Sequence, residues 1–311
     1  MIQRKTTAVI GGGTMGADIA LTLARAGSPT HLVETFAAVR EALPARLQAG
    51  LTLLGSPQAV DRITVHAALD MVPWRNVDLV IEAVPEKLDL KRRLFADLVP
   101  RVRADALLTS NSSSFPISAI AEGLAGPQRF FGLHYFMPAH LVPLVEVVCG
   151  AASDPGLAAE LAAFMRTTGK VPVLVKKDLP GFLANRLQHA LAREAYALIE
   201  AGVATPQDVD AAVRFGFGFR YLAAGPVLQK DHAGIDIHAA AAATMYPTLD
   251  ASTKPAKLLT DLVAAGRLGM KAGAGFYDWT PESIAKERAR YEALLSAALA
   301  LLEPELPKVT T

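Results

Sequence analysis

Short apolar runs alternate with longer amphipathic stretches through the first part of the chain, and this alternation predicts strands separated by helices. The predicted strands span Thr6–Ile10, Thr30–Val33, Leu79–Glu82, Ala106–Ser110, Phe130–Tyr135, Leu144–Val148 and Val171–Val175. The predicted helices span Met15–Ala26, Ala37–Leu54, Leu88–Val102 and Pro155–Thr168. Strands of this kind between helices are typical of a mainly parallel sheet with helices on its faces. We therefore expect an α/β fold with a doubly wound sheet.

The alternation stops after Asp178, and the apolar positions then recur at three- and four-residue spacing, which predicts helices alone. These helices span Gly181–Ala201, Asp208–Phe215, Ile235–Thr244, Ala256–Ala265 and Pro281–Leu302. Pro180 suits the first turn of a helix, and the residue before a proline disfavours helix, so Pro180 and Gly181 mark the junction. We therefore expect residues 1–178 to form the α/β domain and residues 179–311 to form an all-helical C-terminal domain.

The composition narrows the class of partner. The chain has 311 residues, enough for two domains with cores of their own. Its 31 Lys and Arg residues nearly balance its 30 Asp and Glu residues, and no basic stripe stands out, so we expect a small-molecule ligand and no nucleic acid. The single cysteine, Cys149, excludes an intrachain disulfide framework and a multi-cysteine metal site, and it suits a reducing cytosol.

The hydropathy pattern disfavours two further classes of protein. The segment Met1–Thr7 is short and polar, unlike a signal peptide, and the later apolar runs are far shorter than the ~20 residues of a membrane helix. We therefore expect a cytoplasmic protein that has no membrane partner. His232 and His238 lie near acidic residues, but their spacing fits no zinc motif, so we expect no metal.

Gly11, Gly13 and Gly16 fit the pattern G-x-G-x-x-G, with Thr14 and Met15 in its variable positions. The motif follows a predicted strand and opens a predicted helix, which is the context of a dinucleotide-binding turn. Gly11 permits the tight turn, Gly13 lets the backbone approach a pyrophosphate, and Gly16 lets the helix pack closely. The motif therefore predicts a Rossmann-type sheet that binds a dinucleotide at the helix N-terminus.

Glu34 lies at the end of the second predicted strand, directly after Val33 and 18 residues after Gly16, where a carboxylate accepts hydrogen bonds from ribose hydroxyls. This acid would repel the 2′-phosphate of NADP, and neither Thr35 nor Phe36 offers a cation to bind one. We therefore predict NAD as the cofactor, with Arg40 as the residue that would favour NADP instead. The alternative is that Glu34 is an ordinary exposed acid at a strand end.

Two apolar strands each contain one polar residue that hydropathy does not explain. These residues are His134, within Phe131–Phe136, and Glu146, within Leu144–Val148. If the turn between the strands folds them together, Glu146 can orient the imidazole and stabilise its protonated form. A histidine held in this way can act as the acid/base of alcohol oxidation. The alternative is a structural ion pair inside the sheet.

Polar residues also stand where two other elements end or begin. Ser110–Ser114 follows a predicted strand at the sheet edge where ligands bind in α/β folds, although a polar loop that caps the next helix is the alternative. Asn185 lies in the first turns of the helix that starts the C-terminal domain. From there its amide can reach over a cleft, or it can lie on the helix surface.

Motifs along nearly the whole chain resemble those of the 3-hydroxyacyl-CoA dehydrogenase superfamily. Besides the glycine motif they are Val84–Leu88, Ser110–Ser114, Gly132–Phe136, Pro180–Arg186 and Gly273–Trp279. The superfamily includes the L-3-hydroxyacyl-CoA dehydrogenases of fatty acid metabolism, L-gulonate 3-dehydrogenase and λ-crystallin. The resemblance implies a Rossmann domain followed by a helical domain, NAD as the cofactor, and a homodimer.

Matched motif by motif, the resemblance implies His134 and Glu146 as the catalytic pair, with Ser113 and Asn185 holding the substrate oxygen. Together with the glycine motif and Glu34, it gives a set of cofactor contacts: Gly11, Gly13, Thr14, Met15, Gly16, Glu34, Glu86, Lys91, Ser113 and Lys271. The implied reaction is reversible, NAD-dependent oxidation of the secondary alcohol of an L-3-hydroxyacyl-CoA, or of a related small 3-hydroxy acid, to the 3-oxo product.

The chain departs from acyl-CoA members of the superfamily at three points. Met137 stands where an asparagine is usual, so a thioether replaces an amide near the nicotinamide. The region between Glu34 and Glu86 is about one helix shorter, and the missing part carries contacts to coenzyme A. Arg220 resembles the arginine of relatives that act on free acids, where it would bind a substrate carboxylate. The alternative is that Arg220 pairs with Asp231 or another acid of its own domain.

The segments Val173–Gly181 and Thr280–Tyr291 also resemble a dehydrogenase of a pyridine carboxylate. Three kinds of substrate therefore remain open: an acyl-CoA, a free 3-hydroxy acid, and the aldehyde of a small aromatic carboxylate. A non-catalytic NAD-binding protein, or a structural protein like λ-crystallin, is the alternative from another class. The long apolar faces of the predicted C-terminal helices are also consistent with a homodimer.

Overall fold

A computed structural model describes residues 4–310 of the chain, which form two compact units. The first unit extends to Asn185 and includes the C-terminal segment from Glu303 onward. The second unit is Arg186–Leu302. The boundary expected from the sequence is residue 178, with the C-terminal segment in the helical domain. The structure instead packs that segment on the first unit, where the Thr310 amide donates a hydrogen bond to the Thr167 carbonyl at 2.9 Å.

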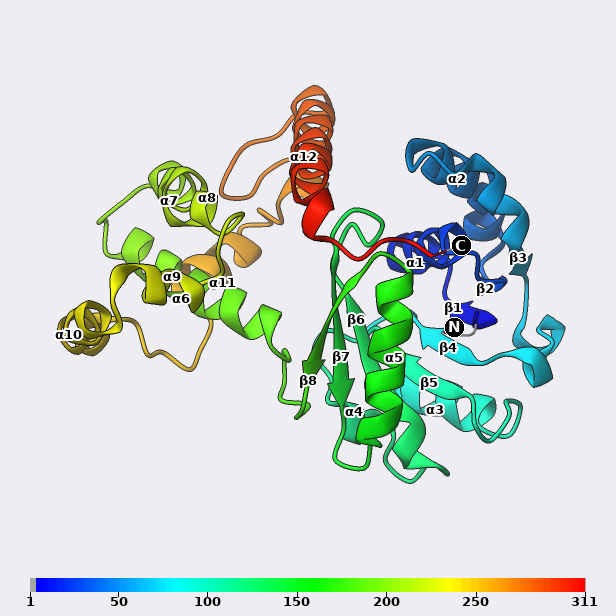
Figure 1. The fold of residues 1–311 in the computed structure, drawn as a ribbon. Coiled ribbons are helices and arrows are strands. Elements are labelled where there is room, and N and C mark those ends of the chain that lie inside the picture. The colour runs from blue at the N-terminus through cyan, green and yellow to red at the C-terminus, as the bar shows by residue number, and fades with distance from the viewer. Residues whose placement is uncertain (1–3, 311) are drawn as a thin grey trace. The chain divides into compact units, whose positions relative to one another are not determined.

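The first unit contains one eight-stranded sheet with the order β3-β2-β1-β4-β5-β6-β7-β8 (Figure 1). Its strands are β1 Thr7–Ile10, β2 Thr30–Val33, β3 Ile63–His66, β4 Leu79–Glu82, β5 Leu107–Ser110, β6 Phe130–Tyr135, β7 Leu144–Cys149 and β8 Val171–Val175. Neighbouring strands are parallel except for β6 and β7, which are antiparallel. The expected doubly wound, mainly parallel sheet is confirmed.

Helices cover both faces of this sheet and bury a core on each side. On one face lie α1 Thr14–Arg25, α2 Ala37–Leu53 and α5 Pro155–Thr167, and on the other lie α3 Leu88–Leu98 and α4 Ile117–Ile120 (Figure 1). Side chains of β1 alternate between the two cores, with Val9 in the first and Ala8 and Ile10 in the second. Burial of both faces explains why these strands consist almost entirely of apolar residues.

The parallel arrangement brings the carboxyl ends of several strands to one edge of the sheet. Because β1, β2, β4, β5 and β6 all run in the same direction, the segments that follow them emerge together. The glycine motif follows β1, Glu34 follows β2, Glu86 lies shortly after β4, and Asn111–Ser114, here called the serine loop, follows β5. His134 lies near the end of β6. The fold thus gathers the predicted site residues of the first unit at one edge, where α/β proteins bind ligands.

The junction between the units differs from the prediction. The sequence predicts a helix from Gly181, but α6 begins at Ala184 and ends at Glu200. Gly181 and Phe182 have φ angles of 77° and 51°, in the left-handed region, so they cannot belong to a right-handed helix. A tight turn therefore precedes α6.

The second unit is mainly helical, as expected, and it also contains the isolated β-bridges Gly269–Ala274 and Ala274–Asp278. After α6 its helices are α7 Pro206–Ala212, the π-helix Val213–Phe217, α8 Gly218–Arg220, α9 Leu228–Ala233, α10 Ile235–Met245, α11 Lys257–Ala264 and α12 Pro281–Leu302. The 3-10 segments of the chain are Pro57–Arg62, Leu69–Met71, Trp74–Asn76, Pro127–Arg129, Tyr246–Thr248, Met270–Ala272 and Glu303–Glu305.

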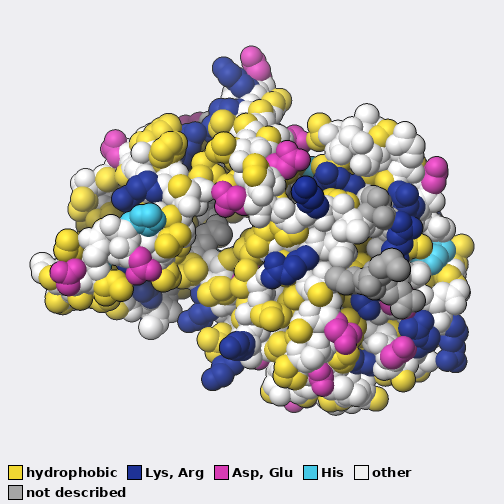
Figure 2. Space-filling view, viewed as in Figure 1, with side chains coloured by type: hydrophobic (Ala, Val, Ile, Leu, Met, Phe, Trp, Pro, Cys, Tyr) yellow, Lys and Arg dark blue, Asp and Glu magenta, His cyan; other side chains and the backbone are white. Residues whose placement is uncertain are grey.

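The helices of the second unit have no buried residues in the structure as described. Hydrophobic side chains instead cover much of this unit on the face in view (Figure 2). The clearest case is α10, whose run Ala239–Ala243 follows the exposed side chains of Ile235 and Ile237. A helix that is apolar nearly all round belongs in a core, and residues 4–310 of a single chain provide none for it.

Candidate active site

His134 and Glu146 face each other across the antiparallel pair β6 and β7, which aligns them as direct partners. Nδ1 of His134 lies 2.8 Å from Oε2 of Glu146, and the two residues are 4% and 0% exposed. The contact expected from the sequence is therefore present. Because Nδ1 is engaged by the carboxylate, Nε2 is the ring nitrogen left to exchange a proton with a ligand.

The second oxygen of Glu146 is held by the start of α6. Oε1 accepts hydrogen bonds from the backbone amides of Leu183, at 3.1 Å, and Ala184, at 2.8 Å. Burial alone would raise the pKa of Glu146, but the hydrogen bonds from His134 and these two amides outweigh it and lower that pKa. Glu146 is thus kept ionised inside the protein, where it can stabilise a protonated His134.

The serine loop lies beside this pair. The Asn185 amide donates a 3.5 Å hydrogen bond to the Ser113 carbonyl, so the two residues that the resemblance assigns to the substrate oxygen do lie together. Oδ1 of Asn111 accepts a hydrogen bond from the Tyr135 amide at 2.9 Å, which ties the loop to the strand that carries His134. Asn111 is not among the predicted site residues, although it belongs to the Ser110–Ser114 motif.

Glu86 fixes the backbone of the serine loop. Its Oε1 accepts hydrogen bonds from the hydroxyls of Ser112 and Ser114, at 2.5 and 2.7 Å, and from the amides of Ser113 and Ser114. Burial raises the pKa of Glu86, but the hydrogen bonds from Ser112, Ser114 and Lys91 outweigh it, and the pKa is lowered. An ionised Glu86 therefore sets the conformation in which Ser113 is presented.

Lys91 lies beneath the loop and is only 1% exposed. Its Nζ is 2.7 Å from Oε1 of Glu82 and 3.1 Å from Oε2 of Glu86. The other oxygen of Glu82 accepts a 2.5 Å hydrogen bond from the Ser110 hydroxyl. The resemblance makes Lys91 a cofactor contact, whereas in the structure its ammonium joins two carboxylates. Glu82 is not among the predicted site residues, although an acid that ends an otherwise apolar strand is a signal of such a contact.

The glycine motif has the shape that a dinucleotide requires. A Cβ atom on Gly11 would approach the Ala83 carbonyl oxygen to 2.7 Å, and one on Gly16 would clash with the Gly11 carbonyl oxygen, whereas one on Gly13 would meet nothing within 4 Å. Space is therefore open only at the position where the backbone must approach a pyrophosphate. The first turn of α1 contains no acid, and no side chain caps it, so its amides suit an anion.

Glu34 is oriented toward the same turn. Its Oε2 accepts a 2.8 Å hydrogen bond from the Gly12 amide, and its Oε1 accepts one of 2.8 Å from the Phe36 amide. Each carboxylate oxygen can accept a further hydrogen bond, as ribose hydroxyls would require. Arg40 donates from Nη1 to the carbonyls of Glu34 and Thr35, at 3.0 and 3.2 Å. The carboxylate of Glu34 is thus placed to accept hydrogen bonds from the ribose hydroxyls of NAD.

A charged cluster that is not predicted from the sequence supports the dinucleotide cradle, which is formed by Gly11–Gly16 and Glu34. Asp18 of α1 is buried and lies 2.8 Å from the guanidinium of Arg46 and 3.0 Å from Nδ1 of His140. Arg46 also donates to the Thr14 carbonyl at 2.9 Å.

Lys170 donates to the carbonyls of Ala139 and Val142, and these hydrogen bonds fix the turn between β6 and β7. Burial lowers the pKa of Lys170 to about 7.

Two predicted site residues belong to the second unit. Lys271 lies in the 3-10 segment Met270–Ala272, and Arg220 ends α8 with an exposed side chain. Within residues 4–310, no ion pair joins Arg220 to Asp231 or to any other acid. Its guanidinium thus has no carboxylate partner in this part of the chain.

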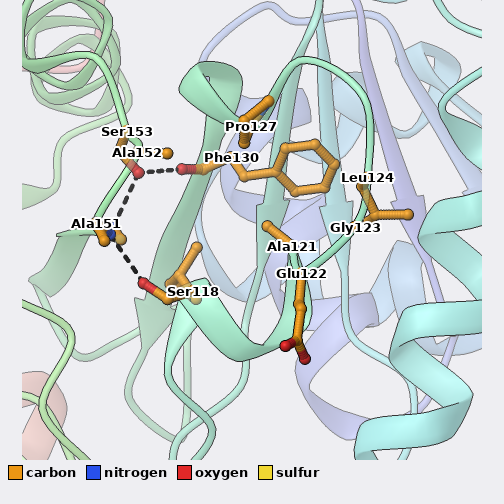
Figure 3. A pocket seen from close by; sticks show the side chains of 12 residues that line it. Ser118, Ala121, Glu122, Gly123, Leu124, Pro127, Phe130, Ala151, Ala152 and Ser153 are labelled. Atoms are coloured by element: carbon orange, nitrogen blue, oxygen red, sulfur yellow. Dashed lines mark hydrogen bonds between the residues drawn. The ribbon is translucent and has the colours of Figure 1, made fainter.

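A pocket of about 250 Å³ lies away from these residues (Figure 3). It is lined by Phe130 at the start of β6 and by Gly150 just after β7, whereas His134 lies near the opposite end of β6. The hydroxyls of Ser118 and Ser153 at its rim are already hydrogen-bonded to the backbone. We therefore assign it no part in the chemistry.

No helix among the described residues is long and apolar enough to cross a membrane. No group of three or more His, Cys, Asp or Glu side chains within residues 4–310 is arranged to hold a metal ion.

A dinucleotide cradle at one sheet edge, beside a buried histidine paired with a carboxylate, defines an NAD-dependent dehydrogenase. Residues 6–179 match the family model of the NAD binding domain of 3-hydroxyacyl-CoA dehydrogenase, and residues 181–279 match that of its C-terminal domain. The chain belongs to the 3-hydroxyacyl-CoA dehydrogenase family. The superfamily and the cofactor expected from the sequence are both confirmed.

Relatives within this family act on different substrates. The chain is 32% identical to the 5-formyl-3-hydroxy-2-methylpyridine 4-carboxylate 5-dehydrogenase of Mesorhizobium japonicum, over 92% of this chain and 95% of that one. It also resembles a solved structure of such an enzyme, described as an NAD+ dependent dismutase, with a TM-score of 0.91, 31% identity, and 97% and 99% of the two chains covered. For (S)-3-hydroxybutyryl-CoA dehydrogenase from Ralstonia eutropha the TM-score is 0.73 at 29% identity, with 89% and 100% covered.

Proposed function

We propose that the chain catalyses the reversible, NAD-dependent oxidation of a secondary alcohol, in an L-3-hydroxyacyl-CoA or a related small 3-hydroxy acid, to the 3-oxo product. The observation that supports this most strongly is the buried contact between His134 and Glu146 at the edge that carries the dinucleotide cradle. A base held by an ionised carboxylate is what removal of an alcohol proton requires. Gly11, Gly13, Thr14, Met15, Gly16 and Glu34 would hold NAD, with Glu86, Ser113 and Lys271 as further contacts.

In this mechanism NAD, when bound, supplies the acceptor for the substrate's hydride. His134 accepts the hydroxyl proton at Nε2, and Glu146 stabilises the imidazolium that results. Ser113 and Asn185 hold the oxygen, whose charge changes as the carbonyl forms. In the reverse direction His134 returns the proton to the same oxygen.

A second candidate is the oxidation of an aldehyde on a small aromatic carboxylate. It is favoured by the higher TM-score with the pyridine carboxylate dehydrogenase than with the acyl-CoA enzyme, 0.91 against 0.73. Water would first add to the aldehyde carbon, and the hydrate would then lose a proton to His134 and a hydride to the cofactor, which leaves a carboxylic acid. The free guanidinium of Arg220 suits a substrate that already carries a carboxylate.

The test is NADH formation with matched substrates: L-3-hydroxybutyryl-CoA, free L-3-hydroxybutyrate, L-gulonate, and 5-formyl-3-hydroxy-2-methylpyridine 4-carboxylate. Turnover of either hydroxybutyryl compound or of gulonate supports the proposal, and turnover of the aldehyde alone replaces it with the second candidate. NAD binding without turnover of any of the four would instead favour a non-catalytic role.

Replacement of Arg220 by methionine is expected to raise KM for a free acid by about tenfold, which corresponds to one charge-assisted hydrogen bond. KM for a thioester without a carboxylate should not change, because nothing on that substrate would pair with the guanidinium. The matched control is Arg288→Met, which removes another exposed arginine of the second unit. Equal effects of Arg220→Met on acid and thioester would contradict this role.

We also propose that the protein is a homodimer in which a second copy covers the helices of the second unit. The support is the absence of buried residues in those helices, together with exposed apolar side chains such as Phe215, Ile235 and Ile237. Sedimentation at decreasing concentration is expected to give twice the chain mass throughout. A folded monomer at micromolar concentration would contradict the proposal.

A cytoplasmic location is the remaining part of the proposal, and it rests on the single cysteine of the chain. Cell fractionation that recovers the native protein outside the cytoplasm would contradict it.

A further inference from the structure

The turn before α6 contains a bulky residue in an unfavourable backbone conformation. Phe182 has φ 51°, and within residues 4–310 every other residue with positive φ is a glycine. The left-handed region is costly for a phenylalanine because its Cβ crowds the following carbonyl. Such a conformation persists only where surrounding contacts determine it, and it often marks a functional position.

The left-handed turn has a direct consequence for Glu146. It reverses the chain immediately before α6, so that the amides of Leu183 and Ala184 both point at Oε1 of the carboxylate. A right-handed helical turn at Gly181 and Phe182, as the sequence suggested, would place those amides along the helix axis instead. The unusual backbone of Phe182 therefore creates two of the hydrogen bonds that Glu146 accepts.

The side chain of Phe182 holds the turn in place. Phe182 is 3% exposed and packs in the core between the sheet and α3. Its ring also meets the His134 ring edge to face, with centroids 5.7 Å apart. Glycine at this position would relieve the backbone but would leave no ring to anchor the turn. The phenylalanine thus joins the strained backbone to the core and to the catalytic histidine.

We propose that Phe182 is a positioning residue of the His134–Glu146 pair, here called the dyad, and that it acts on His134 through Glu146. The proposal rests on the function proposed above for the His134–Glu146 pair. The buried carboxylate stays ionised because the two amides and His134 share its charge. When the turn relaxes, Glu146 loses the amides and no longer fixes the imidazole. Phe182 need not touch the substrate for this effect.

A matched pair of substitutions separates positioning from core packing. Phe182→Leu and Phe95→Leu each remove an aromatic ring from the same core, and the Phe95 ring packs against Phe130 and not against the dyad. Both variants are expected to lower the melting temperature. Only Phe182→Leu is expected to lower kcat, by about tenfold, with KM nearly unchanged, because misoriented catalytic groups lose rate before affinity. Phe182→Tyr should retain activity.

The decisive measurement is a double-mutant cycle with Glu146→Gln. If Phe182 acts through Glu146, Phe182→Leu should cause no further loss of kcat in the Glu146→Gln background. The same tenfold loss in both backgrounds would overturn the proposal, as would an equal loss of kcat in Phe95→Leu.

A second readout does not depend on turnover. The downfield proton of the hydrogen bond between His134 and Glu146, observed by NMR, is expected to shift or broaden in Phe182→Leu and to stay unchanged in Phe95→Leu. A native enzyme that oxidises none of the substrates would refute the proposed function, while this signal would still test the role of Phe182. An unchanged signal in both variants would overturn it.

Discussion

His134→Gln is expected to lower kcat by at least about a hundredfold while NAD binds as in the native protein. Glutamine can still donate to Glu146, so the buried carboxylate keeps a partner, but no group remains that can accept the substrate proton at the position of Nε2. The cofactor cradle is formed by other residues, Gly13 and Glu34 among them, which the substitution leaves in place. The measurement is kcat under saturating substrate, together with a fluorescence titration of NADH.

The matched control for this experiment is His140→Gln. His140 lies in the turn that follows β6 and is partly buried, and its Nδ1 lies 3.0 Å from the carboxylate of Asp18, so it is also a histidine with an acidic partner. It lies outside the dyad, and its loss should change kcat far less than the loss of His134. Unchanged turnover in His134→Gln, or equal losses in the two variants, would show that the His134–Glu146 contact is only a structural ion pair.

The dyad was predictable because His134 and Glu146 are each a polar residue within an otherwise apolar strand. A histidine and a glutamate inside apolar strands must be satisfied by partners, and the short connection between the strands made each the natural partner of the other. The same reasoning applied to Glu82 would have led to Lys91. That pair was missed because a strand-end acid is usually solvated, and because Lys91 stands in a helix with an otherwise ordinary polar face.

Local geometry and weak sequence patterns account for the differences between the predicted elements and those in the structure. Strand β3 is short and lies at the sheet edge, with only Ile63 and Val65 as apolar residues, so its period-two pattern was too brief to detect. The start of α6 was placed too early because the Pro180–Gly181 sequence suits a helix N-terminus. Nothing in the sequence signals that Phe182 is left-handed, since tertiary contacts impose that conformation.

The buried lysine beneath the serine loop offers a test of stability. Lys91→Met is expected to lower the free energy of unfolding by about 3–5 kcal/mol, the usual cost of leaving a buried charge without its partner. The variant would leave Glu82, which is fully buried, and Glu86 facing the same apolar side chain with no cation between them. Urea denaturation, with the midpoint and the slope both fitted, measures this change.

Two controls distinguish the loss of the ion pair from a general effect of the substitution. Lys87→Met removes an exposed lysine next to α3 and should change stability by less than about 0.5 kcal/mol. Adding Glu82→Gln to Lys91→Met should recover part of the loss, because removal of both charges costs less than removal of one. If Lys91→Met were as stable as Lys87→Met, the ammonium would not compensate these carboxylates. The conformation of the serine loop would then have to depend on Glu86 and its hydroxyl partners alone.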